Sequence, residues 1–413
     1  MWAQILTARE QPRLRCARAA DRAGHICRSF APAPARERQV PARDSQAEGP
    51  ASSAAAAGEV TMESQGTHWS AAAKQIDTLV FNLNFRCDKR CSMCCVGATP
   101  SARAADLPLE SIAAVARQLA EAGIAVDAIG LSGGEPFLYG GAGDGEPALA
   151  DVIRVLCDAA PRAICVQTSG VGPMVRDFDR QLDDMFAAAA ARGVALEIES
   201  SYTAYQIPGI DARMAATIEA VLAHQDRFMI YLTSDPDNAR QTLLGFRGLL
   251  GSMGFTKQPP PARDPDPADG EARAPGGDGG DRHLFRFARG GKQVLGRLAL
   301  TLPVGRARRL ALRSPAPATQ FDDGCRWLRG TSLVVHPDGA LGFCCMPTSL
   351  PSAESRYHLG DGDLPTVLAR HQALAQEVVR RWEQLGKAPD RPPLCALCNG
   401  VLGNVGVGTR RGS

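Results

Sequence analysis

Between Asp77 and about residue 301 the chain alternates strand-like and helix-like segments. The strand-like segments are short apolar runs, and between them apolar residues recur at helical spacing, as Ile112, Val115 and Leu119 do ahead of Gly123. Such repeated units predict an α/β fold with a parallel sheet and right-handed crossovers. The six predicted strands span residues 77–85, 127–132, 163–168, 194–200, 227–233 and 293–301.

The segments outside this alternation suggest three parts. Residues 1–70 are rich in Ala, Arg, Pro and Ser without a sustained period, so we expect a disordered extension of translated upstream sequence, with Met62 as the functional start. Residues 75–310 form the predicted core, and the Pro-, Gly- and Asp-rich residues 258–282 form an exposed insertion in it. Residues 311–413 form a small C-terminal domain.

Composition excludes several classes of function. The 413 residues carry a formal net charge of +2, and without a clustered basic face we expect no nucleic-acid partner. Nothing approaches the roughly 18 to 20 apolar residues of a membrane span, so we expect no membrane partner and a cytoplasmic location. In that reducing compartment the 13 cysteines are better explained as ligands of metals or clusters than as disulfides.

Three cysteines follow the first predicted strand with the spacing Cys87-x3-Cys91-x2-Cys94. Three thiolates on one loop can hold a 4Fe-4S cluster and leave one iron without a protein ligand, although the last two cysteines alone would also suit zinc. About forty residues later, a second apolar run ends in the segment Leu131-Ser-Gly-Gly-Glu-Pro136.

With both motifs in this order, the chain resembles the radical S-adenosylmethionine (SAM) superfamily. The resemblance implies a partial (β/α)6 barrel in which Cys87, Cys91 and Cys94 bind a 4Fe-4S cluster. It also implies that the amino and carboxylate groups of SAM chelate the open iron. One electron from the cluster then cleaves SAM to methionine and a 5'-deoxyadenosyl radical, which abstracts hydrogen from a substrate.

The same resemblance implies a set of SAM-binding residues at the ends of the predicted strands. Thr168-Ser-Gly170 is similar to a Thr-Asn-Gly segment of the family, but of a Ser-Leu-Asp segment the chain keeps only Ser200 and lacks the Asp often placed near the substrate. Ordinary turn chemistry would also explain a Thr-Ser-Gly sequence. The implied SAM-binding residues are Met93, Gly133, Gly134, Glu135, Pro136, Thr168, Ser169, Gly170 and Ser200.

A second cysteine group lies in the C-terminal region. Residues 335–339 predict a turn between two short strands, and residues 364–385 predict a helix that ends ahead of a Cys-x2-Cys pair. The group consists of Cys325, Cys344, Cys395 and Cys398. By spacing alone, these four cysteines suit zinc or a 4Fe-4S cluster equally well. The element resembles the twitch extension, the short form of the SPASM extension of radical SAM enzymes. That implies one auxiliary 4Fe-4S cluster, fully ligated by Cys325, Cys344, Cys395 and Cys398.

The remaining cysteines of the predicted domains admit simpler explanations. Cys345 could donate a hydrogen atom to a substrate radical, but a small buried residue in the hairpin is the favoured interpretation, and the same holds for Cys95. Cys157 lies in a predicted helix and Cys165 in a predicted strand, so both are expected in the core.

These observations predict a radical SAM oxidoreductase that abstracts hydrogen from a natural-product small molecule and gives a net oxidation, with an electron donor such as flavodoxin or ferredoxin. Transfer of an electron to the auxiliary cluster would give the oxidation. The alternatives are a maturase or epimerase acting on a ribosomally made peptide and, more remotely, a non-enzymatic zinc-binding protein.

Overall fold

Ten strands form one sheet in the computed structural model, which describes residues 75–92, 94, 96–102, 106–141, 146–170, 175–203, 209–234, 238–259, 284–300, 332–342, 358–359 and 362–384. The spatial order of the strands is β10-β9-β1-β2-β3-β4-β5-β8-β7-β6. Their bounds are β1 Gln75–Asn82, β2 Ala125–Ser132, β3 Ala163–Thr168, β4 Ala195–Tyr202, β5 Arg227–Ser234, β6 Thr256–Gln258, β7 Leu284–Arg289, β8 Lys292–Leu300, β9 Ser332–Val335 and β10 Leu341–Gly342.

The centre of the sheet consists of six neighbouring parallel strands, β1 to β5 and β8. These are the six strands predicted from the sequence, and the prediction of a parallel α/β sheet is confirmed. β10 and β6 are the two ends of the strand order, so the sheet is an unclosed barrel. Because parallel strands end at one edge, the loops that follow β1 to β4 gather there.

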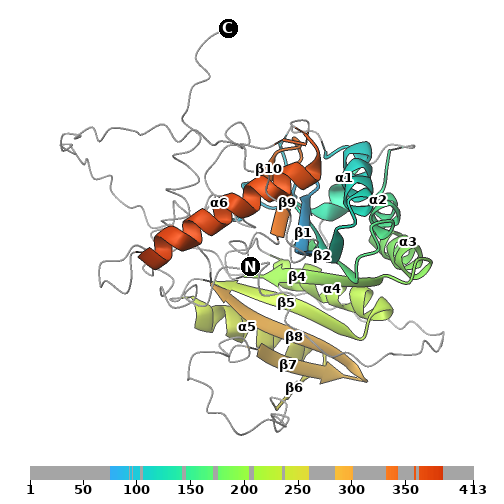
Figure 1. Ribbon diagram of the computed structural model, residues 1–413. Coiled ribbons are helices and arrows are strands. Elements are labelled where there is room, and N and C mark those ends of the chain that lie inside the picture. The colour runs from blue at the N-terminus through green and yellow to red at the C-terminus, as the bar shows by residue number, and fades with distance from the viewer. Residues whose placement is uncertain are drawn as a thin grey trace, which may run out of the picture. The chain divides into compact units, whose positions relative to one another are not determined.

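Five helices pack in sequence order along the sheet: α1 Leu109–Glu121, α2 Leu149–Cys157, α3 Phe178–Ala190, α4 Ile210–His224 and α5 Ala239–Ser252. Each contacts the next, and Figure 1 shows α1, α2 and α3 side by side. The strands present alternate residues to these helices, so that Ile164, Ile198 and Ile230 are fully buried in the main hydrophobic core. Burial of such side chains stabilises the sheet by roughly 1.5 to 3 kcal/mol each.

One edge of the sheet contains strands that sequence reasoning missed. β7 pairs antiparallel with both β8 and the three-residue β6. Most residues of β6 and β7 are only partly buried or exposed, so their sequences lack the apolar run that identified the central strands. The predicted extension, residues 1–70, and residues 260–282 of the predicted insertion lie outside the described residues.

At the other edge, a C-terminal hairpin joins the sheet beside β1. β9 pairs parallel with β1 and antiparallel with β10, and the turn predicted at residues 335–339 is confirmed, with the Gly339 amide donating to the His336 carbonyl. The predicted C-terminal helix is α6, Leu364–Gln384, whose Leu364 amide donates to the Gln118 side chain of α1 at 2.8 Å. None of the described helices combines the length and the apolarity needed to cross a bilayer.

Candidate functional site

The three cysteines with cluster spacing lie on a loop that backbone hydrogen bonds close. The Cys87 amide donates to the Thr99 carbonyl at 3.2 Å, and the Thr99 amide donates to the Phe85 carbonyl at 3.2 Å. Within this cysteine loop, residues 86–99, the Cys94 amide donates to the Cys91 carbonyl at 3.1 Å. Cys87 is buried, whereas Cys91 and Cys94 are partly exposed.

The Gly-Gly-Glu-Pro segment after β2 packs directly on the start of this loop. The Gly134 amide donates to the Asn84 carbonyl and the Glu135 amide to the Arg86 carbonyl, each at 2.7 Å. A Cβ atom at Gly134 would lie 1.9 Å from the Arg86 carbonyl oxygen. Gly133 has a φ of +123°, and its Cβ would lie 2.4 Å from the Asn84 carbonyl oxygen. The two segments therefore touch backbone to backbone, which only glycine permits.

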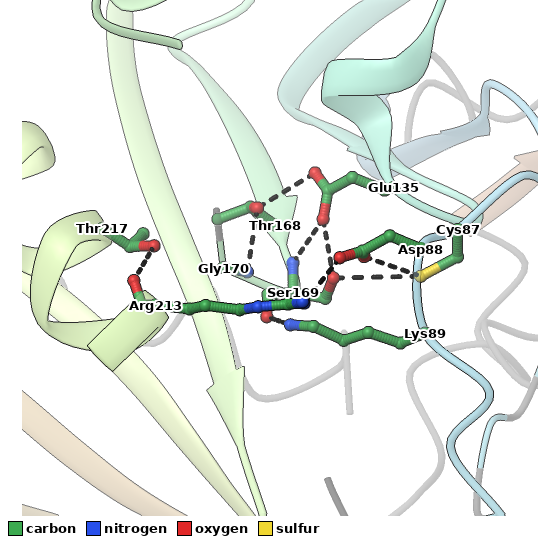
Figure 2. Close-up of polar contacts among 9 residues, drawn as sticks. All are labelled: Cys87, Asp88, Lys89, Glu135, Thr168, Ser169, Gly170, Arg213 and Thr217. Carbon is green, nitrogen blue, oxygen red and sulfur yellow. Dashed lines mark hydrogen bonds and ion pairs between the residues drawn. The ribbon is translucent and has the colours of Figure 1, made fainter. Parts of the chain in front are cut away.

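Glu135 links this segment to the end of β3. Its buried carboxylate accepts four hydrogen bonds. One comes from the Phe137 amide at 3.3 Å. The others, which Figure 2 shows, come from the Thr168 hydroxyl at 2.9 Å and from the Ser169 amide and hydroxyl at 2.8 and 2.7 Å. Burial raises the pKa of Glu135, while the hydrogen bonds from Ser169 and Thr168 and the charge of Lys89 oppose that shift. Pro136 then begins the short 3-10 helix η3, Pro136–Leu138.

Two charged residues of the cysteine loop anchor it to other elements. The Lys89 side chain is only 1% exposed, and its ammonium group donates to the Ser169 carbonyl. Asp88 forms an ion pair with Arg213 of α4, with Oδ2 and Nη1 2.7 Å apart (Figure 2). Sequence reasoning missed both contacts, because a lysine and an aspartate within a loop are ordinarily solvated and nothing local specifies a partner 80 or 125 residues away.

The Cys87 thiol lies beside this polar network. Its sulfur is 3.9 Å from the Ser169 hydroxyl and 3.9 Å from an Asp88 carboxylate oxygen. Burial, followed by the nearby Glu135 charge, raises the pKa of Cys87 to about 12. A thiol binds a metal as thiolate, so a bound cation would release the proton from this group.

Most of the sequence-predicted SAM-binding residues meet in this network. Gly133, Gly134, Glu135 and Pro136 follow β2, and Thr168, Ser169 and Gly170 lie at or just after the end of β3. Ser200 is the register partner of Thr168 on β4, and its buried hydroxyl has no hydrogen-bond partner among the described residues. Met93 lies outside the described residues.

The C-terminal cysteines also lie outside the described residues. These are Cys325, Cys344, Cys345, Cys395 and Cys398. Their hairpin is nevertheless present, and it is tied to β1 by a 3.2 Å hydrogen bond between the Asn82 side chain and His336 Nδ1. The auxiliary cluster therefore stays a prediction.

The cysteine loop suits a cluster better than a single ion. Among the described residues, no three Cys, His, Asp or Glu side chains converge as the ligands of one metal ion would. In a 4Fe-4S cluster each thiolate binds a different iron, so the three thiols of one loop need not meet at a point. Three cysteines on one loop, with a glycine backbone packed directly against that loop, fit that group.

Part of the chain matches a known protein family. Residues 81–227 match the sequence model described as the radical SAM superfamily. These residues are a radical SAM domain. The match covers β1 from Phe81 through the first residue of β5, and thus the cysteine loop and the Glu135 network. The superfamily consists of enzymes that use SAM and a 4Fe-4S cluster. No match was found among curated proteins.

Solved structures of radical SAM enzymes are among the similar folds. Streptococcus suis SuiB bound to S-adenosylmethionine aligns at 11% identity and a TM-score of 0.35 over 71% of this chain, which spans 65% of the length of SuiB. The enzyme anSMEcpe with bound AdoMet aligns at 12% identity and a TM-score of 0.46, covering 80% of this chain and 99% of its own. BtrN in complex with AdoMet and 2-DOIA aligns at 13% identity and a TM-score of 0.35, covering 73% and 87%.

Proposed function

We propose that the protein cleaves SAM reductively and uses the resulting radical to abstract hydrogen from a natural-product small molecule, with net oxidation of that substrate. The observation that supports this most directly is the backbone interlock between the cysteine loop and the Gly-Gly-Glu-Pro segment, within a radical SAM domain. When bound, the 4Fe-4S cluster supplies the electron that cleaves SAM to methionine and a 5'-deoxyadenosyl radical.

In this proposal each residue of the site has a defined task. Cys87, Cys91 and Cys94 would hold the cluster, and the backbone of Gly133 and Gly134 would bind the methionyl end of SAM. The remaining residues assigned to SAM are Met93, Glu135, Pro136, Thr168, Ser169, Gly170 and Ser200.

Glu135 acts mainly by positioning other groups. Both of its carboxylate oxygens already accept two hydrogen bonds, so the side chain fixes Thr168 and Ser169 relative to the cysteine loop. Lys89, buried beside it, supplies a compensating positive charge. Among the described residues of this set, the buried Ser200 hydroxyl has no hydrogen-bond partner, and in this proposal it binds SAM.

The C-terminal cysteines complete the proposal. Cys325, Cys344, Cys395 and Cys398 would ligate one auxiliary 4Fe-4S cluster of the twitch type. Full ligation would leave no iron for the substrate and would suit this cluster to accept an electron from the substrate radical, which gives an oxidation. A flavodoxin or ferredoxin would supply the electron for SAM cleavage.

The test is anaerobic reconstitution followed by reduction with dithionite in the presence of SAM. We expect about eight irons per chain, for two four-iron clusters, and slow formation of 5'-deoxyadenosine without any substrate. Changing Cys87, Cys91 and Cys94 together to Ala should remove about half of the iron and all of the cleavage. Stoichiometric zinc without charge-transfer absorption would instead identify a zinc-binding protein and exclude the proposal.

A further inference from the structure

The cysteine loop contains a lysine that is buried, although lysine side chains ordinarily reach solvent. Lys89 lies between Cys87 and Cys91 in the sequence and is only 1% exposed. Its ammonium group donates to the Ser169 carbonyl just after β3 (Figure 2). Withdrawing an ammonium group from water costs free energy, and a neutral side chain such as methionine would fill the position without that cost. The buried charge therefore indicates a role other than packing.

Lys89 also contacts the first cysteine of the cluster motif. Its backbone amide hydrogen-bonds to the Cys87 sulfur. Its side chain holds Ser169, whose hydroxyl is 3.9 Å from the same sulfur. Lys89 thus approaches Cys87 directly through its amide and indirectly through Ser169. In iron-sulfur proteins, hydrogen bonds to the ligand sulfurs and the net charge at the site help to set the reduction potential of the cluster.

Two carboxylates act on Cys87, and each has a cationic partner. Burial is the main cause that raises the pKa of Cys87, followed by the charge of Glu135 and, more weakly, that of Asp88. The Lys89 charge opposes the rise in the pKa of Glu135 that burial causes. Arg213 forms a 2.7 Å ion pair with Asp88. Loss of the Lys89 ammonium group would therefore leave one negative charge beside Cys87 without its partner.

A surplus of negative charge at this position works against reduction of a bound cluster. Reduction adds one electron, and hence one negative charge, to a group that thiolate ligands already make more negative. Charges in a buried site are weakly screened, so a nearby positive charge favours that step and a nearby negative charge disfavours it. Removal of the charge at Lys89 therefore lowers the reduction potential.

We propose that Lys89 sets the reduction potential of the SAM-site cluster, raising it through the fixed positive charge of its ammonium group. This rests on the proposed function, in which a flavodoxin or ferredoxin passes one electron to the cluster. The donor is oxidised by one electron as the cluster is reduced by one, and the Lys89 charge makes this transfer more favourable. Lys89 acts through its charge and is not a ligand of the cluster.

The experiment is a potentiometric titration of the anaerobically reconstituted full chain, followed by electron paramagnetic resonance. The signal of the SAM-site cluster is the one that is lost when Cys87, Cys91 and Cys94 are all changed to Ala. We expect Lys89→Met to make one-electron reduction at least tenfold less favourable, which is a midpoint potential lower by about 59 mV or more. Lys89→Arg keeps the charge and should show less than half of that shift.

Two further variants separate the charge from other effects. Lys89→Gln removes the charge but keeps a group that can donate to the Ser169 carbonyl, so it should lower the potential as Lys89→Met does. Lys257→Met is the matched control, because Lys257 is exposed on β6, and it should leave the potential unchanged. A wild-type potential in Lys89→Gln, or an equal shift in Lys257→Met, would overturn the inference.

Asp88→Asn tests the sign of the effect, and it decides the matter if the neutral variants of Lys89 bind no cluster. This change removes a carboxylate from the same loop and leaves the charge of Arg213 in surplus, so the potential should rise. A structural disturbance gives no reason for opposite shifts in Lys89→Met and Asp88→Asn. An unchanged or lower potential in Asp88→Asn would overturn the role given to charge.

The remaining outcomes distinguish this inference from the proposed function. If the wild-type protein cleaves SAM but Lys89→Met and Lys89→Gln have the wild-type potential, Lys89 has no such role and the proposed function stands. If the potentials shift as expected but the reduced wild-type protein forms no 5'-deoxyadenosine from SAM, the inference stands and the proposed function fails.

Discussion

At the scale of single residues, the candidate site places negative and positive side chains around Cys87 so that their charges offset one another. Glu135 and Asp88 bring two carboxylates next to Cys87, a position that also has to accept thiolate charge when a cluster binds. Lys89 and Arg213 oppose them, one through a buried ammonium group and the other through an ion pair. Buried charges are tolerated when they are paired in this way, and the pairs also fix the direction in which the loop approaches β3.

Glu199 gives stability a predictable dependence on pH. Its pKa is raised from 4.5 to about 7, chiefly by burial and also by the Glu197 charge, against the effects of Cys165, Tyr231 and Arg297. The folded state therefore binds more protons than the unfolded state between these values, so stability falls as pH rises from about 4.5 to about 7. Relative to Glu199→Gln, we expect wild type to lose up to roughly 3 kcal/mol of unfolding free energy over this window.

Urea unfolding of both proteins at pH 5 and pH 8 measures this loss. Glu121→Gln serves as the control, because this carboxylate is exposed at the end of α1 and does not contribute to the pKa shift of Glu199. An equal difference between wild type and Glu199→Gln at the two pH values would show that Glu199 titrates normally.

The residues of the site differ in how far the sequence could reveal them. The cysteines, Gly133 to Pro136 and Thr168 to Gly170 were recognisable because they are contiguous and follow apolar runs. Asp88 and Arg213 were not, because their pairing depends on how α4 is placed relative to a loop 125 residues earlier. The burial of Gln167 beside Glu199 likewise depends on strand register, which no local pattern specifies.

At the scale of elements, the interlock of two loops makes Gly134 intolerant of a side chain. In Gly134→Val the Cβ would meet the Arg86 carbonyl oxygen at 1.9 Å, and because both atoms belong to backbone, the cysteine loop has to move. We expect loss of the iron bound by that loop and of SAM cleavage, with destabilisation of about 1 to 3 kcal/mol. The clash is between backbone atoms of the protein itself, so the loss of iron does not depend on SAM binding.

Gly248→Val is the matched control for this change. Gly248 lies on α5, and a Cβ there meets no atom within 4 Å. Iron analysis, 5'-deoxyadenosine formation and thermal unfolding of the two variants provide the comparison. Full iron content and cleavage in Gly134→Val would contradict the role given to the interlock.

Element boundaries show what apolar patterning can and cannot predict. The third strand was predicted correctly at residues 163–168, because its first four residues, Ala163 to Val166, form the apolar run expected of a buried parallel strand. The first was predicted at residues 77–85 but ends at Asn82, since Leu83 and Phe85 continue the apolar pattern into the loop that pairs with the glycine segment. β6 and β7 were missed because they lie at an exposed edge.

At the scale of the whole molecule, the proposed function makes the reaction outcome depend on both cysteine groups, and this can be tested. An oxidation returns no hydrogen to the substrate, so a product formed in deuterated water should carry no new carbon-bound deuterium. We also expect Cys345→Ala to retain both clusters and product formation, with a stability loss of at most about 1 kcal/mol. Mass spectrometry of the product checks both points.

The opposite result has a defined meaning. One deuterium in the product, together with an inactive Cys345→Ala protein that keeps both clusters and SAM cleavage, would identify an epimerase and contradict the oxidation. Loss of iron in the same variant would instead show that Cys345 contributes to holding a cluster.

The position of β9 beside β1 bears on how the protein is made. Asn82 and His336, which hydrogen-bond across this junction, are 254 residues apart. At a synthesis rate of about 5 to 20 residues per second, one edge of β1 waits roughly 13 to 50 s for its partner strand to leave the ribosome. An unpaired strand edge invites association with other chains. The nascent chain therefore passes through a period in which one edge of the strand leading into the cysteine loop is unpaired and open to such association.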